Sequence, residues 1–344
     1  MPPNLDVGHG SRIRIVIPDD INGAYAVAPE TERLRAAGQV DIHGTRAASE
    51  AELAERIRDA TVVLSFRPAF TRFPCSVLHA APHLRMICIS GTGVEDVAVA
   101  AATARGIAVA NVVGAANRAV AELCLALMLA VARAVPWQDR SVRRGEWTGR
   151  QGIELGGKVL GIVGLSAIAR ELCPMARALG MDVISWSRDN DPARARAAGS
   201  TAVSFDELLR RANVISLHPR LTDATRHLVG ADQLARVKDG AILINTGRGG
   251  LIDEPALLAA LQSGKLAGAG LDVFAAEPLP AGHPLLGLDN VVMTPVSAWN
   301  TVDASARMIR QSIDNVVSFL SGAPINVVNP QALQANNVEN GGGS

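Results

Sequence analysis

The chain has 344 residues, of which 48% are hydrophobic and 19% charged, so we predict a globular protein with two domains. Lys and Arg together number 33, as do Asp and Glu, and this zero net charge argues against nucleic acid as the main partner. The four cysteines are far apart and form no CxxC pair, which predicts neither a metal site nor a disulfide framework and fits a reducing compartment. Because the amino terminus lacks the apolar core of a signal peptide, we expect a cytoplasmic protein.

The first hundred residues alternate between strand-like and helix-like segments. The strands are "RIRIVIPDD", "TVVLSF" and "LRMICISGTG", and the helices between them are "ASEAELAERIRDA" and "PCSVLHAAPHL". This alternation predicts βαβ units and a parallel sheet. A further strand, "GIAVANV", leads to a long apolar helix at about 116–135. Glu122 interrupts this helix and Arg118 and Arg133 flank it, so we interpret it as a buried helix rather than a membrane span.

A second alternating series begins at "GKVLGIVGL". Its strands are "KVLGIVG", "DVISWS", "NVISLH", "AILINTG", "AGAGLDVF" and "VVMTP", with helices such as 168–180 and 253–264 between them. Six strands in this order predict a doubly wound nucleotide-binding domain. The last helix, about 299–320, carries an apolar stripe and is expected to pack back on the first domain.

The predicted fold class is therefore α/β, with two Rossmann-like doubly wound domains, parallel sheets and a cofactor cleft between them. We place a discontinuous substrate domain at 1–112 and 299–330, and a Rossmann domain that binds NAD or NADP at 113–298. The polar, Gly-rich tail, 331–344, is predicted to be disordered.

The turn after the strand "KVLGIVG" reads "GLSAIA" and approximates the dinucleotide fingerprint G-x-G-x-x-A. Gly164 can make the tight turn and Ala169 allows close helix packing. Ser166 departs from the pattern, because a Cβ there crowds the approach of the pyrophosphate, although its hydroxyl could donate to a phosphate at a helix N-terminus.

The next strand ends "VISWSRD", where an acidic residue would bind the ribose 2′-hydroxyl and an Arg would accommodate a 2′-phosphate. Ser187 and Arg188 come first and Asp189 one step later, which favours NADP over NAD. The alternative is that Arg188 is only a solvated loop charge.

Another strand end, in "NVVMTPVSAWN" at 290–300, stands where an open α/β enzyme gathers its reacting groups. Residues 296–299 nevertheless provide no side chain that exchanges a proton near pH 7.

Seven segments in order resemble the D-isomer-specific 2-hydroxyacid dehydrogenase family: "GTGVEDVAVAAATARGIAVAN", "NRAVAEL", "GKVLGIVGL", "SLHPRLTDATRHLVG", "ILINTGRGGLIDEPALLAAL", "AGLDVFAAEPLP" and "HPLLGLDNVVMTP". The resemblance spans roughly 10–325. It implies a bilobal oxidoreductase that transfers hydride between NADP or NAD and a small 2-hydroxy or 2-oxo acid. It also implies a homodimer formed through the long helix near 116–135.

Carried over by position, the resemblance makes Arg248 the arginine that clamps the substrate carboxylate and polarises its carbonyl. Glu277 matches the glutamate that orients the family's catalytic histidine, and Asp272 matches a residue at the nicotinamide end of the site. The turn of Gly91, Thr92 and Gly93 matches the loop whose N–H groups hold the substrate carboxylate. The expected cofactor-binding residues are Gly164, Ser166, Ala167, Ile168, Ser187, Arg188, His218, Pro219, Thr222, Thr246, Gly247 and Asp272. Taken singly, each of these residues could instead have an ordinary structural role.

The family's catalytic histidine directly follows "TP", and this chain has Val296 there. Reducing a ketone requires a proton for the developing alkoxide, and a valine cannot supply it. His218 stands at a strand end, but its position matches a histidine beside the cofactor, so a structural or cofactor-contact role is favoured over a surrogate acid. His283 is expected to support a loop, and "HPRLT" replaces the family's usual "HLPLT".

Three hypotheses follow. The chain could be an active NADP-dependent oxidoreductase that moves its proton through water or Ser297. It could be a binding protein that keeps the fold, with or without the nucleotide, but has lost turnover and has a regulatory or scaffolding role. It could also catalyse a reaction that needs no proton transfer to the substrate oxygen, such as hydride abstraction from a formate-like anion.

Overall fold

The computed structural model describes residues 13–66 and 71–338. The chain forms two compact units. The first comprises Met1–Ala116 with Val302–Ser344, and the second comprises Asn117–Thr301. The first unit is therefore built from both ends of the chain and the second from its middle. These boundaries lie a few residues from those expected from the sequence.

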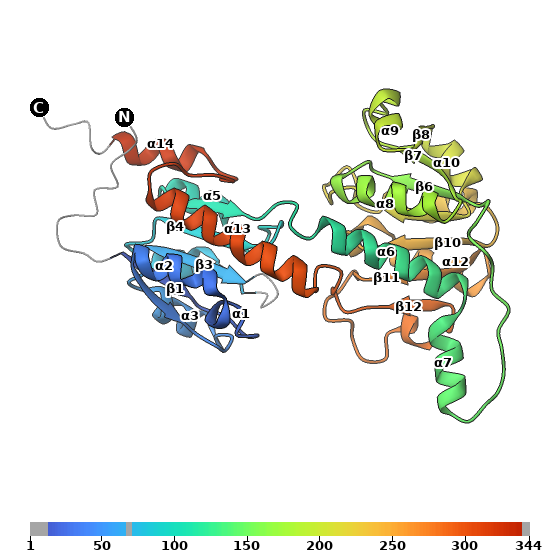
Figure 1. The fold of residues 1–344 in the computed structure, drawn as a ribbon, viewed down its shortest axis with the longest axis horizontal. Helices are drawn as coiled ribbons and strands as arrows, with labels where there is room; N and C mark the ends of the chain where they lie inside the picture. Colours follow the sequence, from blue (N-terminus) through green and yellow to red (C-terminus); the bar gives the residue numbers. More distant parts are fainter. Residues whose placement is uncertain (1–12, 67–70, 339–344) are drawn as a thin grey trace, which may run out of the picture. The chain divides into compact units, whose positions relative to one another are not determined.

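The first unit contains a five-stranded parallel sheet in the order β2-β1-β3-β4-β5 (Figure 1). Its strands are β1 (Arg14–Ile17), β2 (Gln39–Ile42), β3 (Val62–Phe66), β4 (Met86–Ser90) and β5 (Ala108–Asn111). Its helices are α1 (Ala24–Val27), α2 (Glu32–Ala37), α3 (Glu50–Ile57), α4 (Cys75–His79), α5 (Val99–Ala104), α13 (Val302–Leu320) and α14 (Gln331–Val338), with a 3₁₀ turn, η1, at Pro29–Thr31.

Burial in this unit follows the apolar runs in the sequence. Every residue of β3 and of β4 is buried, as expected for central strands of a parallel sheet. The amphipathic helix α13 packs against β4 (Figure 1). Its buried apolar side chains are Ala304, Met308, Ile309, Ile313, Val316 and Phe319. These recur at helical spacing, so one face of the helix covers the sheet.

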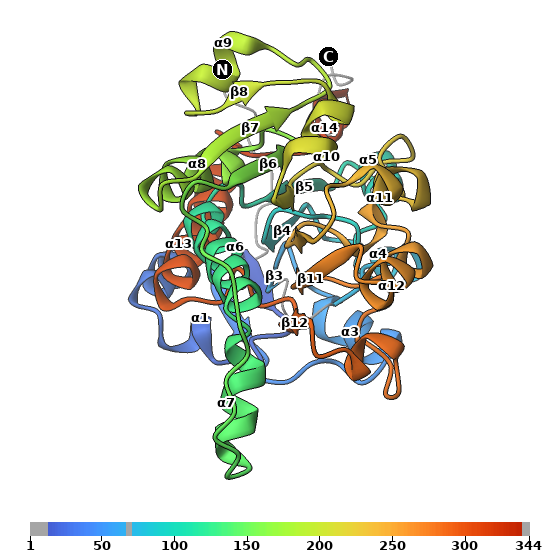
Figure 2. The same ribbon diagram turned by 90° about the vertical axis from the view of Figure 1, so that its right-hand side faces the viewer.

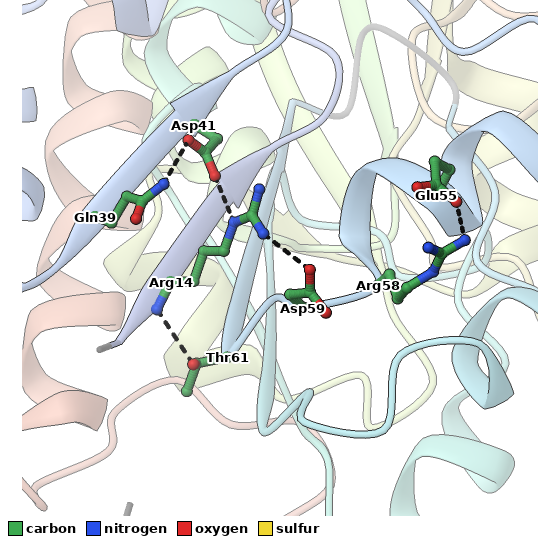
Figure 3. Close-up of polar contacts among 7 residues, drawn as sticks. All are labelled: Arg14, Gln39, Asp41, Glu55, Arg58, Asp59 and Thr61. Carbon is green, nitrogen blue, oxygen red and sulfur yellow. Dashed lines mark hydrogen bonds and ion pairs between the residues drawn. The ribbon is translucent and has the colours of Figure 1, made fainter. Parts of the chain in front are cut away.

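Polar contacts fasten the edge of this sheet (Figure 3). Arg14 on β1 donates Nε–H to Asp41 on β2 at 2.6 Å, and its Nη1 donates to Asp59, just after α3, at 3.0 Å. The backbone N–H of Arg14 also donates to the hydroxyl of Thr61 at 3.2 Å. Both ion pairs are partly exposed to solvent, so they align the edge strand more than they stabilise it. A pair between Arg58 and Glu55 lies nearby on the surface.

The second unit contains a seven-stranded parallel sheet in the order β12-β11-β10-β9-β6-β7-β8. Figure 2 labels β6, β7 and β8 of this sheet, and also β11 and β12. Its strands are β6 (Val159–Val163), β7 (Asp182–Trp186), β8 (Thr201–Ala202), β9 (Val214–Leu217), β10 (Ala241–Asn245), β11 (Leu266–Leu271) and β12 (Val291–Met293). Its helices are α6 (Asn117–Ala132), α7 (Val135–Arg143), α8 (Ala167–Ala178), α9 (Pro192–Ala197), α10 (Phe205–Arg211), α11 (Ala231–Arg236) and α12 (Glu254–Gln262), with 3₁₀ turns η3 (Gly249–Leu251) and η4 (Pro284–Gly287).

The strand order of the second unit reverses beside β6, which pairs with β7 on one side and β9 on the other. The chain therefore runs from β6 through β7 to β8 at one edge of the sheet, and from β9 to β12 at the other edge. In an open parallel sheet this arrangement opens a crevice at the carboxyl ends of the strands. The fold class predicted from the sequence, two Rossmann-like α/β domains with parallel sheets, is confirmed.

The helix expected at about 116–135 is α6, which ends three residues earlier than expected, and α7 follows it at once. The chain bends at Ala134, whose φ of 49° is left-handed, and α6 and α7 meet at 62°. The reason is local, because Pro136 in the first turn of α7 cannot continue a preceding helix. Within the described residues no single helix is long and apolar enough to cross a membrane, and α6 and α7 meet that test only when joined.

Helix α14 replaces part of the tail that was predicted to be disordered. It begins at Gln331, Ala332 is fully buried, and the helix packs against α5. This burial orders a segment whose composition alone indicates a polar tail. The remainder of that tail, 339–344, lies outside the described residues.

Candidate active site

A tight turn joins β6 to α8 at the crevice of the second sheet. Gly164 has φ of 85°, and a Cβ on it would lie 2.8 Å from the backbone nitrogen of Pro219. Its N–H donates to the carbonyl of Trp186 at the end of β7 at 2.7 Å. Only glycine fits a left-handed residue wedged between two neighbouring strand ends.

Ser166 is the N-cap of α8. It does not leave the backbone open to the pyrophosphate as a glycine would. Its hydroxyl oxygen accepts from the N–H of Ala169 at 3.3 Å, as a capping serine does. The N–H groups of Ala167 and Ile168 have no acceptor among the described residues. Two free N–H donors at the positive end of a helix suit a phosphate, so the pyrophosphate of a dinucleotide fits here.

The tip of β7 holds a small ionic network. The carboxylate of Asp189 accepts from the Ser187 hydroxyl at 2.7 Å through one oxygen and pairs with Arg194 through the other. Arg194 also donates to the carbonyl of Leu165 at 2.9 Å. The hydrogen bond from Ser187, followed by the charge of Arg194, lowers the pKa of Asp189. Arg188 between them is exposed to solvent.

Beneath the turn, the ends of β9 and β10 carry buried polar groups. His218 follows β9, and its Nε2 lies 2.9 Å from the hydroxyl of Ser216. Burial lowers the pKa of His218 from 6.5 to about 4, so the ring is neutral at pH 7. Thr246 follows β10, and its hydroxyl lies 3.0 Å from the thiol of Cys124 on α6. Burial raises the pKa of Cys124 to about 11, so the thiol stays protonated.

Thr222 was also expected near the cofactor. It lies in an exposed turn after Pro219, where its backbone N–H and its hydroxyl contact Thr225 at 2.8 and 3.1 Å. These contacts stabilise the turn itself. Pro219 is half-buried and touches Gly164 through its backbone.

Arg248 follows β10 in a loop that Asn245 holds together. The Asn245 side chain accepts from the N–H of Gly247 and donates to the carbonyl of Arg248, both at 3.0 Å. The guanidinium of Arg248 is half-buried and donates to the Gly247 carbonyl at 2.9 Å. The sequence reasoning missed Asn245, although an amide at the end of an apolar strand is a recognisable signal for a loop brace.

The Arg248 loop packs tightly on the loop after β11. A Cβ on Gly249 would lie 1.9 Å from the carbonyl oxygen of Phe274, so the two backbones touch and only glycine fits. Glu277 lies in this second loop. It is exposed, and its Oε1 accepts from the N–H of Phe274 at 3.0 Å. The cationic and the anionic candidate residue thus stand on adjoining loops.

Asp272 organises the segment that follows β12. Its carboxylate is almost fully buried, with 2% of the residue exposed. It accepts hydrogen bonds from the hydroxyl of Thr294 at 2.6 Å and from the N–H groups of Ser297 and Ala298 at 2.8 and 3.0 Å. Burial raises the pKa of Asp272 and these donors oppose that shift. Three donors aimed at one carboxylate favour its ionised form.

Val296 lies in the segment that Asp272 holds. Its N–H donates to the carbonyl of Asp272 at 2.9 Å, and its φ is 54°. Trp299 donates its indole N–H to the Val296 carbonyl at 2.9 Å. The side chain is half-buried and aliphatic, so this position provides neither an acid nor a base.

His283 pairs with Glu254 at 2.9 Å and accepts from the N–H of Leu285 through Nδ1. It ties the segment after Glu277 to the start of α12, in the supporting role expected for it.

In the first unit, the Gly91–Gly93 turn is fixed to β5. The Thr92 hydroxyl donates to the Val112 carbonyl at 3.1 Å, and Asn111 donates to the Thr92 carbonyl at 2.6 Å. The N–H groups of Thr92 and Gly93 have no acceptor among the described residues.

The second unit therefore gathers a phosphate-binding helix end, a guanidinium and two carboxylates at the carboxyl ends of its strands. These groups can bind a dinucleotide and an anionic substrate. In the part of the chain that the structure describes, no side chain that exchanges a proton near pH 7 lies at the end of β12.

Known proteins match both the sequence and the fold. Residues 125–298 match the family model described as the NAD-binding domain of D-isomer-specific 2-hydroxyacid dehydrogenases. The chain is 40% identical to a glyoxylate reductase of Aeropyrum pernix over 273 residues, which cover 76% of this chain and 82% of that protein. It spans about half the length of the D-3-phosphoglycerate dehydrogenases it matches in Archaeoglobus fulgidus and Methanocaldococcus jannaschii.

Solved structures agree. The TT0316 protein of Thermus thermophilus superposes with a TM-score of 0.83 at 35% identity, covering 92% of this chain and 100% of that one. An acyclic imino acid reductase solved with NADPH and D-Arg superposes with a TM-score of 0.81 at 27% identity, with the same coverage. Because the sequence matches extend over most of the chain and the fold agrees throughout, the chain belongs to the D-isomer-specific 2-hydroxyacid dehydrogenases, a family of NAD(P)-dependent oxidoreductases.

Proposed function

We propose that the chain interconverts small 2-oxo and 2-hydroxy acids with a nicotinamide cofactor, and that its proton reaches the substrate through water or Ser297. The observation that carries this proposal is the set of groups at the strand ends of the second unit, where Arg248 follows β10, Asp272 follows β11 and the N-terminus of α8 follows β6. Ser297 supports the proton route because its hydroxyl lies 3.5 Å from the Asp272 carboxylate.

The residues divide the work as follows. The N–H groups of Ala167 and Ile168 would hold the pyrophosphate. When bound, the nicotinamide supplies or accepts the hydride. Arg248 binds the substrate carboxylate. Neutral His218 contacts the cofactor and donates no proton at pH 7.

Two further hypotheses stand beside this one. Val296 favours a nucleotide-binding protein with little or no turnover and a regulatory role, because an aliphatic side chain stands where the family has its catalytic histidine. The same residue also favours a reaction such as hydride abstraction from a formate-like anion, which leaves no alkoxide to protonate.

We infer that NADPH is the preferred cofactor. Discrimination in favour of NADH requires a free carboxylate at the tip of β7 to accept from the ribose hydroxyl. Both oxygens of Asp189 are already engaged, by Ser187 and by Arg194. The exposed guanidinium of Arg188 suits a 2′-phosphate instead.

We also infer a homodimer, formed through α6, α7 and the segment after them. Large apolar side chains are exposed there in the single chain, with Trp147 93% exposed. The others are Leu129, Val135 and Val142. Such surfaces usually mark protein contacts. We also propose that the protein is cytoplasmic, which the free thiols of Cys75, Cys88, Cys124 and Cys173 support.

The test has two stages. Titration with NADPH and NADH, followed by protein fluorescence, should show binding with NADPH preferred. Turnover of glyoxylate and hydroxypyruvate should then be measurable in the parent and increase by about 10²-fold or more in Val296→His, since a positioned acid typically contributes that much. Val296→Asn is the matched control, because it fits the same backbone conformation without a titratable ring.

Each outcome separates the hypotheses. Failure to bind either cofactor refutes an oxidoreductase role. Binding without turnover in the parent, together with a large gain in Val296→His, supports the nucleotide-binding hypothesis. Turnover of formate but not of the 2-oxo acids supports the third.

A further inference from the structure

Among the described residues, the end of β12 has no side chain that exchanges a proton near pH 7 and could protonate the product of ketone reduction. Val296 gives no proton, and the Asp272 carboxylate is saturated by Thr294, Ser297 and Ala298. Reduction of a 2-oxo acid would leave an alkoxide, which needs a proton during the reaction. A substrate that already carries its proton on the reacting group would remove that need.

Glu277 adds an independent observation. Its Oε1 accepts from Phe274, and its second oxygen has no partner among the described residues. No histidine stands at position 296 for this carboxylate to orient. Beside a 2-oxo acid, which carries only negative charge, such a carboxylate repels the substrate. It attracts a substrate that carries a cationic group next to its own carboxylate.

The positions of the two loops fit such a dipolar ligand. Gly249 brings the Arg248 loop into contact with the loop of Phe274 and Glu277. The latter follows β11, whose Leu271 pairs with Met293 of β12 just before the segment of Val296. A guanidinium, which suits a carboxylate, and a carboxylate, which suits a nitrogen cation, therefore belong to touching loops, one of which follows the strand next to β12.

We propose that the preferred substrate of this site is a protonated 2-imino acid, which is reduced to a 2-amino acid. This inference rests on the proposed function, since hydride again comes from the bound nicotinamide. The hydride bonds to C2, the π electrons of C=N become the lone pair of nitrogen, and the nitrogen keeps the protons it brought. The amine then takes a proton from water. The imine itself forms in solution from a 2-oxo acid and ammonia or a primary amine, with loss of water.

The chain's own residues then have consistent roles. Arg248 binds the carboxylate, and Glu277 accepts a hydrogen bond from the cationic nitrogen of substrate or product. Val296 forms an aliphatic wall that gives no proton and takes none, so the nitrogen keeps its charge until it is reduced.

Binding tests this without turnover. Isothermal calorimetry on the whole chain, loaded with the oxidised cofactor, should compare D-alanine with D-lactate, which differ only in ammonium against hydroxyl. We expect D-alanine to bind about tenfold tighter or more, as a charge-assisted hydrogen bond implies. Glu277→Gln should remove that difference. Glu254→Gln, which removes a carboxylate that pairs with His283, should preserve it.

Turnover gives a second readout. Pyruvate should be reduced at least about 10²-fold more slowly alone than with ammonium or methylamine, since no acid assists the ketone. Val296→His should accelerate pyruvate alone and so narrow the difference between the rates with and without amine. Equal rates with and without amine, or D-lactate binding as tightly as D-alanine, overturn the inference while the cofactor-dependent function stands. A chain that binds neither NADPH nor NADH overturns both.

Discussion

Val296 donates its backbone N–H to the carbonyl of Asp272 at 2.9 Å while adopting φ of 54°. The Asp272 carboxylate simultaneously binds the residues on either side, Thr294, Ser297 and Ala298. A β-branched residue is thus held in a left-handed conformation by a buried anion. Left-handed geometry is costly for such residues, so the contacts of Asp272 must offset the strain.

The strain predicts that Val296→Asn stabilises the protein. Asn tolerates left-handed geometry, and we expect the free energy of unfolding to increase by about 1 kcal/mol. Urea denaturation followed by circular dichroism would measure it. Val302→Asn is the control, because Val302 is exposed at the first turn of α13, in ordinary helical backbone, and should show no gain. A loss of stability in Val296→Asn would contradict the prediction.

His218 predicts a dependence of stability on pH. Burial holds its pKa at about 4 in the folded chain against 6.5 in the unfolded one. The unfolded state therefore takes up a proton first as the pH falls. The free energy of unfolding should fall by about 3 kcal/mol between pH 6.5 and pH 4 from this residue alone.

Substitution of His218 by Asn should flatten that part of the pH profile, because an amide can still bond to Ser216 but takes up no proton. Denaturant unfolding across this pH range would measure the slopes. The exposed His227→Asn is the matched control and should leave the slope unchanged. An unchanged slope in His218→Asn would show that other groups carry the acid sensitivity.

Arg188 predicts cofactor preference. Arg188→Ala should weaken NADPH binding by about tenfold and leave NADH binding nearly unchanged, because only NADPH has a phosphate for the guanidinium. Arg196→Ala removes an equal charge from the exposed surface of α9 and is the control. Equal loss for the two cofactors would assign Arg188 to general attraction of anions.

We predict that substitutions of Ser166 affect the stability of the protein and its binding of NADPH in different ways. Ser166→Ala loses the hydroxyl that caps α8 and should cost about 1 kcal/mol of unfolding free energy. Ser166→Gly should cost only a few tenths of that, while removing the Cβ beside the pyrophosphate. We therefore expect Gly to bind NADPH more tightly than the parent and Ala to bind it no better. Weaker binding by Ser166→Gly would show that the hydroxyl itself contacts the phosphate.

Much of the fold could be predicted because the strands are short apolar runs bounded by turn residues. The fully buried β3, β4 and β10 are unmistakable in the sequence. The edge strands β2 and β8 were missed, since they are only partly buried and have no apolar run of their own. Their pairing partners, β1 and β7, determine that they are strands. The end of α6 was predicted to within three residues, but the helix α7, which begins directly after it, was not predicted.

The sequence by itself determined that position 296 is aliphatic, that Gly164 begins a phosphate-type turn, and that Arg248 and Glu277 follow strands of one sheet. Only the tertiary structure decided whether any neighbour replaces the missing acid. Asp272 is saturated, His218 is buried and neutral, and the two oxygens of Asp189 are engaged. These properties depend on hydrogen bonds between residues that lie up to 26 positions apart in the sequence. Such hydrogen bonds form only after parallel strands pair and bring their carboxyl ends to one edge of the sheet.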